Sequence, residues 1–337
     1  MISVVLPVRN TADTLPRALA SLAAQTLADF ELVAVDDGSD DGGATLRVLR
    51  AAAGRDARLR VLDRPHDGIA AALNTGLAAA RGRYIARMDA DDVCHPRRLE
   101  LQAGYLDAHP EIGLVSCLAA FGGDPDAAAG YLAHIEWANS VRTPQAIRQA
   151  IFRESPLPHP TVMFRAELPN RFGGYRDGAF PEDYELWLRW LEAGVDMAKI
   201  PQALMTWNDP PGRLSRTDPR YDPEAFHRIK AGYLARLLAR INPHHPEIHV
   251  VGAGRITRRR AEHLLAHGVV IKAWLDIDPR KVGMVLGGRP VLHMRDAPAP
   301  ERCFVVPYVA SRGAPEYIAE TLERRGFKLG RSYLPAA

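Results

Sequence analysis

Cysteine and long apolar runs are scarce in this chain of 337 residues. The three cysteines, Cys94, Cys117 and Cys303, are too few and too scattered for a disulfide framework or a Cys-x-x-Cys metal site. No segment approaches the roughly 20 apolar residues that a membrane-spanning helix needs. The N-terminus has no basic leader and meets Pro7 and Arg9 too early for a signal peptide. We therefore expect a cytoplasmic protein in a reducing compartment.

Charge of one sign is not in large excess either. The chain has 43 basic and 40 acidic residues, with a formal net charge of +3, so we expect no nucleic-acid partner. The basic residues are 38 arginines and 5 lysines, and an arginine-rich surface suits anionic phosphates or lipid headgroups. A composition of 47% hydrophobic and 25% charged residues is typical of a soluble globular protein.

The first 120 residues alternate short β-branched runs with helix-length segments. The runs predict strands at residues 3–6, 31–35, 60–62 and 84–88. Strands spaced in this way indicate βαβ units and a mostly parallel sheet, in which ligands bind outside the carboxyl ends of the strands. The acidic turns 36–41 and 89–92 both follow predicted strands, so we expect them to face one crevice.

Two acidic turns in one crevice repel each other unless a cation lies between them. A hard divalent cation that also binds substrate phosphates is the usual solution, since Mg²⁺ takes one or two carboxylates together with phosphate oxygens. The alternative is that residues 36–41 form a solvated turn and that Asp91 and Asp92 cap the following helix. The position of Asp89 and Asp91 directly at a strand end favours the ligand site.

Six motifs stand in order between about residues 2 and 240. They are Val-Leu-Pro-Val-Arg-Asn (5–10), Val-Asp-Asp-Gly-Ser (35–39), Gly-Arg-Tyr-Ile (82–85), Arg-Met-Asp-Ala-Asp-Asp (87–92), His-Pro-Thr-Val-Met-Phe (159–164) and Glu-Asp-Tyr-Glu-Leu-Trp-Leu-Arg (182–189). In this order and spacing the chain resembles the family 2 glycosyltransferases. The resemblance implies the α/β GT-A fold, a mostly parallel sheet flanked by helices, and inverting transfer from a nucleotide-sugar donor.

The resemblance also implies a donor site on the first strands. Pro7 and Arg9 stand where the family lines the nucleotide pocket. Asp37 corresponds to the carboxylate that binds the base, and Asp36 precedes it on the same turn. Asp89 matches the first acid of the DxD motif, which is expected near the ribose.

The remaining implied residues serve the metal, the acceptor and the diphosphate. Asp91 matches the ligand of a Mn²⁺ or Mg²⁺ ion that bridges the donor diphosphate. Asp183 is expected to be the general base, with Glu182 as the other candidate, although acids also favour a helix N-terminus through the helix dipole. His159 is a candidate for the acceptor side or a structural histidine. Arg213 lies in the proline-rich loop 210–223, which is either a lid over the diphosphate or an ordinary surface loop.

A second α/β pattern follows residue 245. A strand, a glycine turn at Gly252 and Gly254, and a helix precede Asp276, which ends the next strand. This pattern resembles a small Rossmann-like domain, so we expect a GT-A domain over 1–243 and a Rossmann-like domain over 246–337. Cofactor binding and a structural or docking role both remain open for the second domain.

The resemblance therefore implies a metal-dependent, inverting hexosyltransferase of surface polysaccharide biosynthesis. Its expected partners are a nucleotide-sugar donor and a carbohydrate or lipid-linked sugar acceptor, with peripheral association at the inner face of the membrane. One alternative is an NAD(P)-dependent oxidoreductase centred on the C-terminal domain, where no catalytic Tyr-Lys or Cys/His arrangement is recognisable. The other is a nucleotide-sensing scaffold, which the presence of Asp37, Asp91 and Asp183 disfavours.

Overall fold

The computed structural model describes residues 1–210 and 212–337, and it divides the chain into two compact units. Unit 1 comprises Met1–Ile147 and Pro156–Asp218, and unit 2 comprises Arg148–Ser155 and Pro219–Ala337. Pro211, in the proline-rich loop of the sequence analysis, lies outside the described residues. None of the helices in the described residues is both long enough and apolar enough to cross a membrane.

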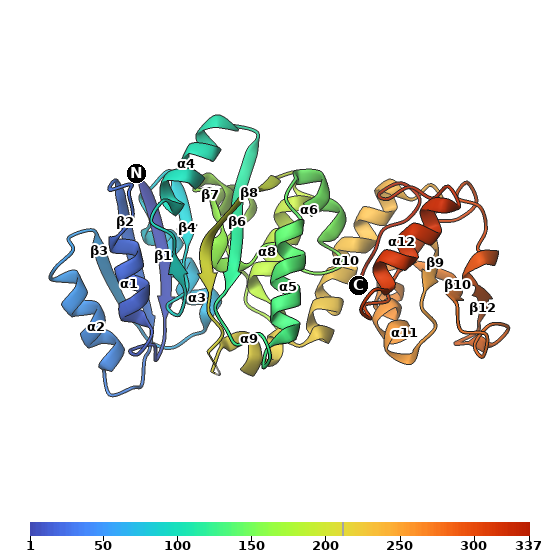
Figure 1. The fold of residues 1–337 in the computed structure, drawn as a ribbon, viewed down its shortest axis with the longest axis horizontal. Helices are drawn as coiled ribbons and strands as arrows, with labels where there is room; N and C mark the ends of the chain where they lie inside the picture. Colours follow the sequence, from blue (N-terminus) through green and yellow to red (C-terminus); the bar gives the residue numbers. More distant parts are fainter. Residues whose placement is uncertain (211) are drawn as a thin grey trace. The chain divides into compact units, whose positions relative to one another are not determined.

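Unit 1 is built on an eight-stranded sheet of order β3-β2-β1-β4-β7-β6-β8-β5 (Figure 1). Its strands are β1 (Ile2–Val8), β2 (Phe30–Asp37), β3 (Leu59–Arg64), β4 (Tyr84–Arg87), β5 (Val93–Cys94), β6 (Ile112–Phe121), β7 (Met163–Arg165) and β8 (Asp196–Trp207). The strands β3, β2, β1 and β4 are parallel, and β6 is parallel to β8. The strand β7 is antiparallel to β4 and β6, and β5 is antiparallel to β8. The predicted mostly parallel sheet is confirmed.

Helices flank this sheet. The helical segments that begin in unit 1 are α1 (Leu15–Ala23), α2 (Ala44–Ala53), α3 (Ile69–Ala79), α4 (Arg98–Ala108), α5 (Ala129–Ser140), α6 (Pro144–Ala150), η1 (His159–Thr161), α7 (Glu167–Phe172), α8 (Glu182–Glu192) and α9 (Leu214–Thr217). The last residues of α6 belong to unit 2. Alternate residues of a strand point to opposite faces, and β2 shows this clearly. Leu32 and Ala34 join the core cluster that includes residues of α1 and α4, whereas Val33 and Val35 pack with Ala72 of α3. This two-sided burial explains why the first strands are continuous apolar runs.

Unit 2 contains a five-stranded sheet of order β11-β12-β10-β9-β13. Its elements are η2 (Pro219–Tyr221), α10 (Pro223–Ile241), β9 (Glu247–Val251), α11 (Arg255–Glu262), η3 (His263–His267), β10 (Val270–Asp276), β11 (Val285–Leu286), β12 (Arg289–His293), η4 (Met294–Asp296), β13 (Val305–Pro307) and α12 (Ala314–Arg324). The strands β12, β10, β9 and β13 are parallel, and β11 is antiparallel to β12. The sequence-based boundary at 243–246 falls inside this unit, because α10 packs on η3 and α11.

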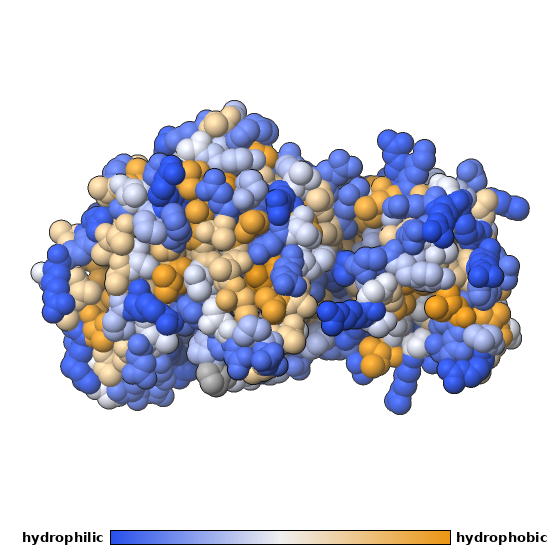
Figure 2. All heavy atoms as spheres, viewed as in Figure 1, coloured by the Kyte–Doolittle hydropathy of each residue, from blue (hydrophilic) through white to orange (hydrophobic). Residues whose placement is uncertain are grey.

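Figure 2 shows that hydrophilic side chains cover much of the visible face of each unit, with groups of hydrophobic side chains interspersed among them.

Candidate active site

Three parallel strands bring the first sequence motifs to one edge of the sheet. The last residue of β1, Val8, pairs with Asp36 of β2, and Val5 of β1 pairs with Arg87 at the end of β4. Because the strands are parallel, their carboxyl ends lie at the same edge. The two acidic turns that follow β2 and β4 therefore lie at this edge.

Four of the proposed donor-binding residues lie at the carboxyl ends of β1 and β2. Asp37, the last residue of β2, is described separately below. Pro7 is buried within β1, and Arg9 directly follows the strand with its side chain 42% exposed. The guanidinium of Arg9 lies 3.7 Å from the carboxylate of Asp40. Asp36 is buried and accepts hydrogen bonds from the N–H and Oγ of Ser39, at 3.1 and 2.5 Å, which close the turn.

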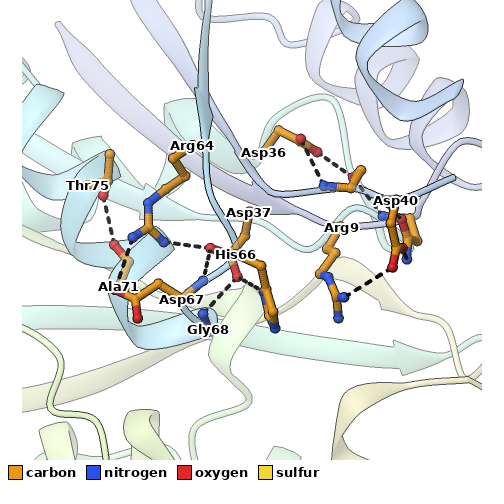
Figure 3. Close-up of polar contacts among 12 residues, drawn as sticks. Arg9, Asp36, Asp37, Asp40, Arg64, His66, Asp67, Gly68, Ala71 and Thr75 are labelled. Carbon is orange, nitrogen blue, oxygen red and sulfur yellow. Dashed lines mark hydrogen bonds and ion pairs between the residues drawn. The ribbon is translucent and has the colours of Figure 1, made fainter. Parts of the chain in front are cut away.

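Asp37 joins this turn to the one between β3 and α3 (Figure 3). Its buried carboxylate accepts hydrogen bonds from Arg64 at 2.6 Å and from His66 at 2.8 Å. The two turns also meet at Gly38, which has a φ of +65°. A Cβ atom there would lie 2.5 Å from the backbone nitrogen of His66, so a larger residue would force the turns apart.

The turn after β4 gathers three carboxylates. Asp89, Asp91 and Asp92 each offer one oxygen, and these oxygens lie within 4.8 Å of one another. Burial and the neighbouring Asp89 carboxylate raise the pKa of Asp91 to about 6, and burial also raises the pKa of Asp92. One Asp92 oxygen accepts a hydrogen bond from the N–H of Asn208 at 2.8 Å.

The other Asp92 oxygen is the observation that fits a metal ion. This atom, Oδ2, is buried and has no hydrogen-bond partner among the described residues. An unpartnered buried oxygen beside two further carboxylates is unfavourable without a cation, and carboxylate oxygens are the ligands that Mg²⁺ and other hard cations prefer. The donor set therefore fits a divalent cation.

Arg87 connects the acidic turn to the N-terminus of α8. Its buried guanidinium pairs with the carboxylate of Asp89. Although burial acts to lower the pKa of Arg87, the negative charges of Asp89 and Glu182 raise it above its ordinary value. The same arginine and Asp89 also act on the pKa of Asp183. The DxD acids and the acids of α8 thus share one electrostatic site.

The helix α8 begins with the two carboxylates that the sequence predicted as candidate bases. Glu182 is 2% exposed, and Asp183 is partly buried beside it. Burial and the neighbouring Glu182 charge raise the pKa of Asp183 to about 7. The N–H of Tyr184 donates to Asp183 at 2.6 Å. A carboxylate with a pKa near neutrality is well matched to proton transfer at physiological pH.

His159 lies against the same acids and is part of a packed group. Its Nε2 lies 2.8 Å from the hydroxyl of Tyr175, its Nδ1 lies 3.8 Å from Glu182, and its ring meets Trp187 edge-on. Burial and the charge of Arg87 lower the pKa of His159 and keep the ring neutral. This packing favours a structural role for the histidine.

Arg213 stands over the acidic turn. Its guanidinium lies 3.9 Å from the ring centre of Trp207, 3.5 Å from Asp89 and 4.0 Å from Asp92. Arg213 also donates to the backbone oxygen of Asn208. Among the described residues, Arg87 and Arg213 are the cationic side chains that form ion pairs with this turn.

The structure thus brings together Asp89, Asp91, Glu182, Asp183, His159 and Arg213, whereas Pro7, Arg9, Asp36 and Asp37 form a neighbouring group at the same sheet edge. Sequence reasoning assigned no ligand-binding role to Arg87, Asp92 and His66. The position of Asp92 directly after the DxD motif could have indicated that it belongs to the same acidic cluster. His66 carried no signal, because only the fold places its turn against Asp37.

Comparisons with known proteins identify the family of the chain. A sequence model described as Glycosyl transferase family 2 matches residues 3–168. The amylovoran biosynthesis glycosyltransferase AmsE of Erwinia amylovora is 33% identical over 211 residues, which cover 61% of this chain and 75% of AmsE. EpsE of Bacillus subtilis strain 168 is 31% identical over 211 residues, which cover 60% of this chain and 71% of EpsE.

Solved structures show the same fold. The crystal structure of residues 1–349 of S. aureus TarS in complex with UDP-GlcNAc superposes with a TM-score of 0.56 and 21% sequence identity. The match covers 70% of this chain and 66% of the TarS chain.

The mostly parallel sheet, with acidic turns at the carboxyl ends of β2 and β4, has the GT-A fold. The chain belongs to the family 2 glycosyltransferases. The comparisons favour this activity over the oxidoreductase alternative.

Proposed function

We propose that the protein is a metal-dependent, inverting hexosyltransferase that moves a sugar from a nucleotide-sugar donor to a carbohydrate or lipid-linked sugar acceptor. The observation that carries the proposal is the shared electrostatic site of the DxD acids and the α8 acids, joined through Arg87. Sugar transfer requires one group that neutralises the charge of the leaving diphosphate and another that removes the proton of the acceptor hydroxyl. The DxD acids and the α8 acids are two such groups. The name of AmsE, a glycosyltransferase of amylovoran biosynthesis, supports a role in surface polysaccharide assembly. Peripheral association with the inner face of the membrane is part of the same proposal.

In this proposal the donor lies along the carboxyl edge of the sheet. Its nucleoside contacts the group formed by Pro7, Arg9, Asp36 and Asp37, and its ribose lies near Asp89. A donor of this class is supported by TarS, which shares the fold and was solved with UDP-GlcNAc.

Asp91 holds a Mn²⁺ or Mg²⁺ ion with its neighbours in the acidic turn. The ion supplies charge neutralisation for the diphosphate leaving group. The unpartnered Asp92 Oδ2 and the raised pKa of Asp91 support this assignment. Asp183 accepts the proton of the acceptor hydroxyl, and Glu182 keeps the pKa of Asp183 high.

The proposal is tested by incubating the protein with Mn²⁺, a panel of UDP- and GDP-sugars and candidate oligosaccharide or lipid-linked acceptors. Release of the nucleoside diphosphate should depend on both the metal and the acceptor, and the product linkage should have inverted anomeric configuration. Transfer that persists unchanged in excess EDTA, or with retained configuration, would contradict the proposal.

We also propose that Arg213 contacts the diphosphate of the donor, and a substitution tests this. Arg213→Ala should weaken Mn²⁺-dependent UDP binding by roughly tenfold, because a charge-assisted hydrogen bond is lost. Isothermal titration calorimetry gives the affinity. The control is Arg216→Ala on α9, whose guanidinium pairs with Asp209 and lies over Tyr131. Equal losses in both variants would indicate a general effect on the loop and contradict the contact.

The C-terminal residues 246–337 are proposed to be a Rossmann-like unit without a direct part in sugar transfer. The Oδ2 of Asp276 accepts hydrogen bonds from the N–H of Ala253 at 2.9 Å and from Lys281 at 3.1 Å. This oxygen is therefore already hydrogen-bonded to residues of the same chain. Thr257 fills the space beside Gly252, where a Cβ atom would lie 2.6 Å from its methyl group.

We therefore expect Asp276→Ala to leave donor affinity and transfer rate unchanged in the full chain. The measurement is titration of the wild type and the variant with UDP, NAD(H) and NADP(H). Micromolar NAD(P) binding that the substitution removes would make this unit a second ligand site instead.

A further inference from the structure

A cluster of buried polar side chains lies inside unit 2 and includes none of the proposed transfer residues. Its members are His227 and Lys230 of α10, Arg260 of α11, and Tyr308, which directly follows β13. His227 and Lys230 stand three residues apart on one helix, so their side chains share a face. The helix α11 packs against α10, and the ring centres of His227 and Tyr308 lie 5.9 Å apart. Three elements of unit 2 therefore contribute to this polar cluster.

Three atoms of the polar cluster are buried without a hydrogen-bond partner. They are Nδ1 of His227, Nε of Arg260 and the hydroxyl oxygen of Tyr308, and none has a partner among the residues that the structure describes. His227 is 7% exposed and Tyr308 is 2% exposed. Burying a polar atom costs free energy unless another group forms a hydrogen bond with it. Three such atoms in one cluster point to a ligand with several hydrogen-bond acceptors.

The charge of the polar cluster is positive. Lys230 is 2% exposed, and burial lowers its pKa to about 7, an effect that Glu154 opposes and Arg260 strengthens. Burial, together with the charges of Lys230, Arg260 and His263, lowers the pKa of His227, so this ring is neutral at physiological pH. The cations therefore repel one another, and an anion between them would relieve the repulsion.

The acid of α10 beside this cluster is engaged with other partners. Glu224 lies 2.6 Å from Nε2 of His263 and accepts a hydrogen bond from Arg259 at 2.8 Å. Its negative charge is therefore shared with these two side chains, while the ammonium group of Lys230 and the guanidinium of Arg260 remain opposed by Glu154.

We propose that His227, Lys230, Arg260 and Tyr308 form a binding site for a phosphate group. A phosphate has the negative charge and the acceptor oxygens that this cluster calls for. Nε–H of Arg260, the hydroxyl of Tyr308 and Nδ1–H of one neutral tautomer of His227 each donate to an oxygen, and Lys230 balances the charge. The phosphate belongs either to the free inorganic anion or to a nucleotide. The inference does not depend on the proposed sugar transfer.

The test is thermal melting of the full-length protein in EDTA, with potassium phosphate compared with potassium chloride at equal ionic strength. Phosphate at millimolar concentration should raise the melting temperature of the wild type, because a ligand of the native state stabilises it. Parallel measurements with AMP and UMP separate the two sources. A gain with phosphate alone identifies the free anion as the ligand, and a gain with a nucleotide alone identifies a nucleotide phosphate.

Tyr308→Phe removes the unpartnered hydroxyl and little else. Without phosphate this variant should melt at the same or a higher temperature than the wild type, because no hydrogen bond of the chain is lost. Its affinity for the stabilising anion, measured by calorimetry, should fall roughly tenfold. Lys230→Met, which removes the charge, should also lose the gain in melting temperature.

The matched control is Tyr333→Phe in the same unit. The buried hydroxyl of Tyr333 donates to Glu323 at 2.7 Å, so this variant should melt at a lower temperature but keep the gain from the anion.

Three results would overturn the inference. One is the absence of any gain in the wild type with phosphate, AMP or UMP. Another is the same gain in Tyr308→Phe as in the wild type. The third is a Tyr308→Phe protein that melts well below the wild type without phosphate, which would show that an ordered water already satisfies the hydroxyl.

Discussion

Replacement of Asp91 by asparagine should abolish both Mn²⁺-dependent UDP binding and sugar transfer. The carboxylate of Asp91 lies within 4.8 Å of two others, and burial with the Asp89 charge raises its pKa to about 6. An ionised carboxylate in this position is unfavourable unless a cation balances it. Asparagine keeps the shape of the side chain but removes the charge that attracts the cation. Calorimetric titration with UDP, with Mn²⁺ and with EDTA, measures the effect.

Thermal melting separates this effect from misfolding. The pKa of Asp91 is raised above its ordinary value of 3.8, so its contribution to stability is present below about pH 4 and is lost as the pH rises through about 6. At pH 8 in EDTA, Asp91→Asn should therefore melt at the same or a higher temperature than the wild type. In Mn²⁺ and UDP the wild type should gain stability and the variant should not. The control is Asp126→Asn, at an exposed site in the loop before α5. Full transfer by Asp91→Asn would contradict the metal assignment.

Asp183→Asn should lower the turnover number by roughly 10²–10⁴-fold, which is the usual contribution of a general base. UDP affinity should stay close to that of the wild type, because the proposed role is toward the acceptor. Steady-state kinetics with saturating donor and acceptor give the turnover number, and calorimetry gives the affinity. Loss of UDP binding with normal turnover of bound donor would make Asp183 a donor ligand instead.

The pH dependence gives a second test of the same base. A general base acts in its ionised form, and the pKa of Asp183 is raised to about 7. If Asp183 is the base, turnover should rise as the pH increases through about 7. The charge of Glu182 contributes to this raised pKa, so Glu182→Gln should move the rise to lower pH. A profile that is the same in both proteins would contradict the coupling of the two acids.

The contribution of Asp183 to folding stability should fall as the pH rises, whereas turnover should increase. Protonation is favoured in the folded state, so the stability contributed by this group is present below about pH 4 and is lost as the pH rises through about 7. Above pH 7, Asp183→Asn should therefore be at least as stable as the wild type, and melting curves across this pH range check the direction.

Much of the fold followed from local patterns in the sequence. The short β-branched runs at residues 3–6 and 31–35 predicted two strands, and the structure confirms them as β1 and β2, which are buried along their whole length. The helix-length spacing predicted parallel pairing, which in turn predicted that the turns after β2 and β4 share an edge. These inferences succeed because strand alternation and parallel pairing depend on near neighbours and on chain length.

The boundary between units was less accessible from the sequence. The segment 242–246 has the composition of a linker, yet α10 before it packs with η3 and α11 of unit 2. The domain to which a helix belongs depends on which other elements pack against its apolar face. The sequence of the helix does not identify those elements.

By itself, the sequence determined the family, the α/β class and the acids at the strand ends, because these depend on motifs whose residues are close along the chain. Only the tertiary structure determined the pKa values and the hydrogen-bond partners of those acids. The pKa of Asp183 depends on burial and on Arg87, which lies far away in sequence. The carboxylate of Asp37 is hydrogen-bonded by the turn that contains His66, 29 residues further along the chain. Burial and charge–charge interactions act through space, so they exist only once the strands and turns are assembled.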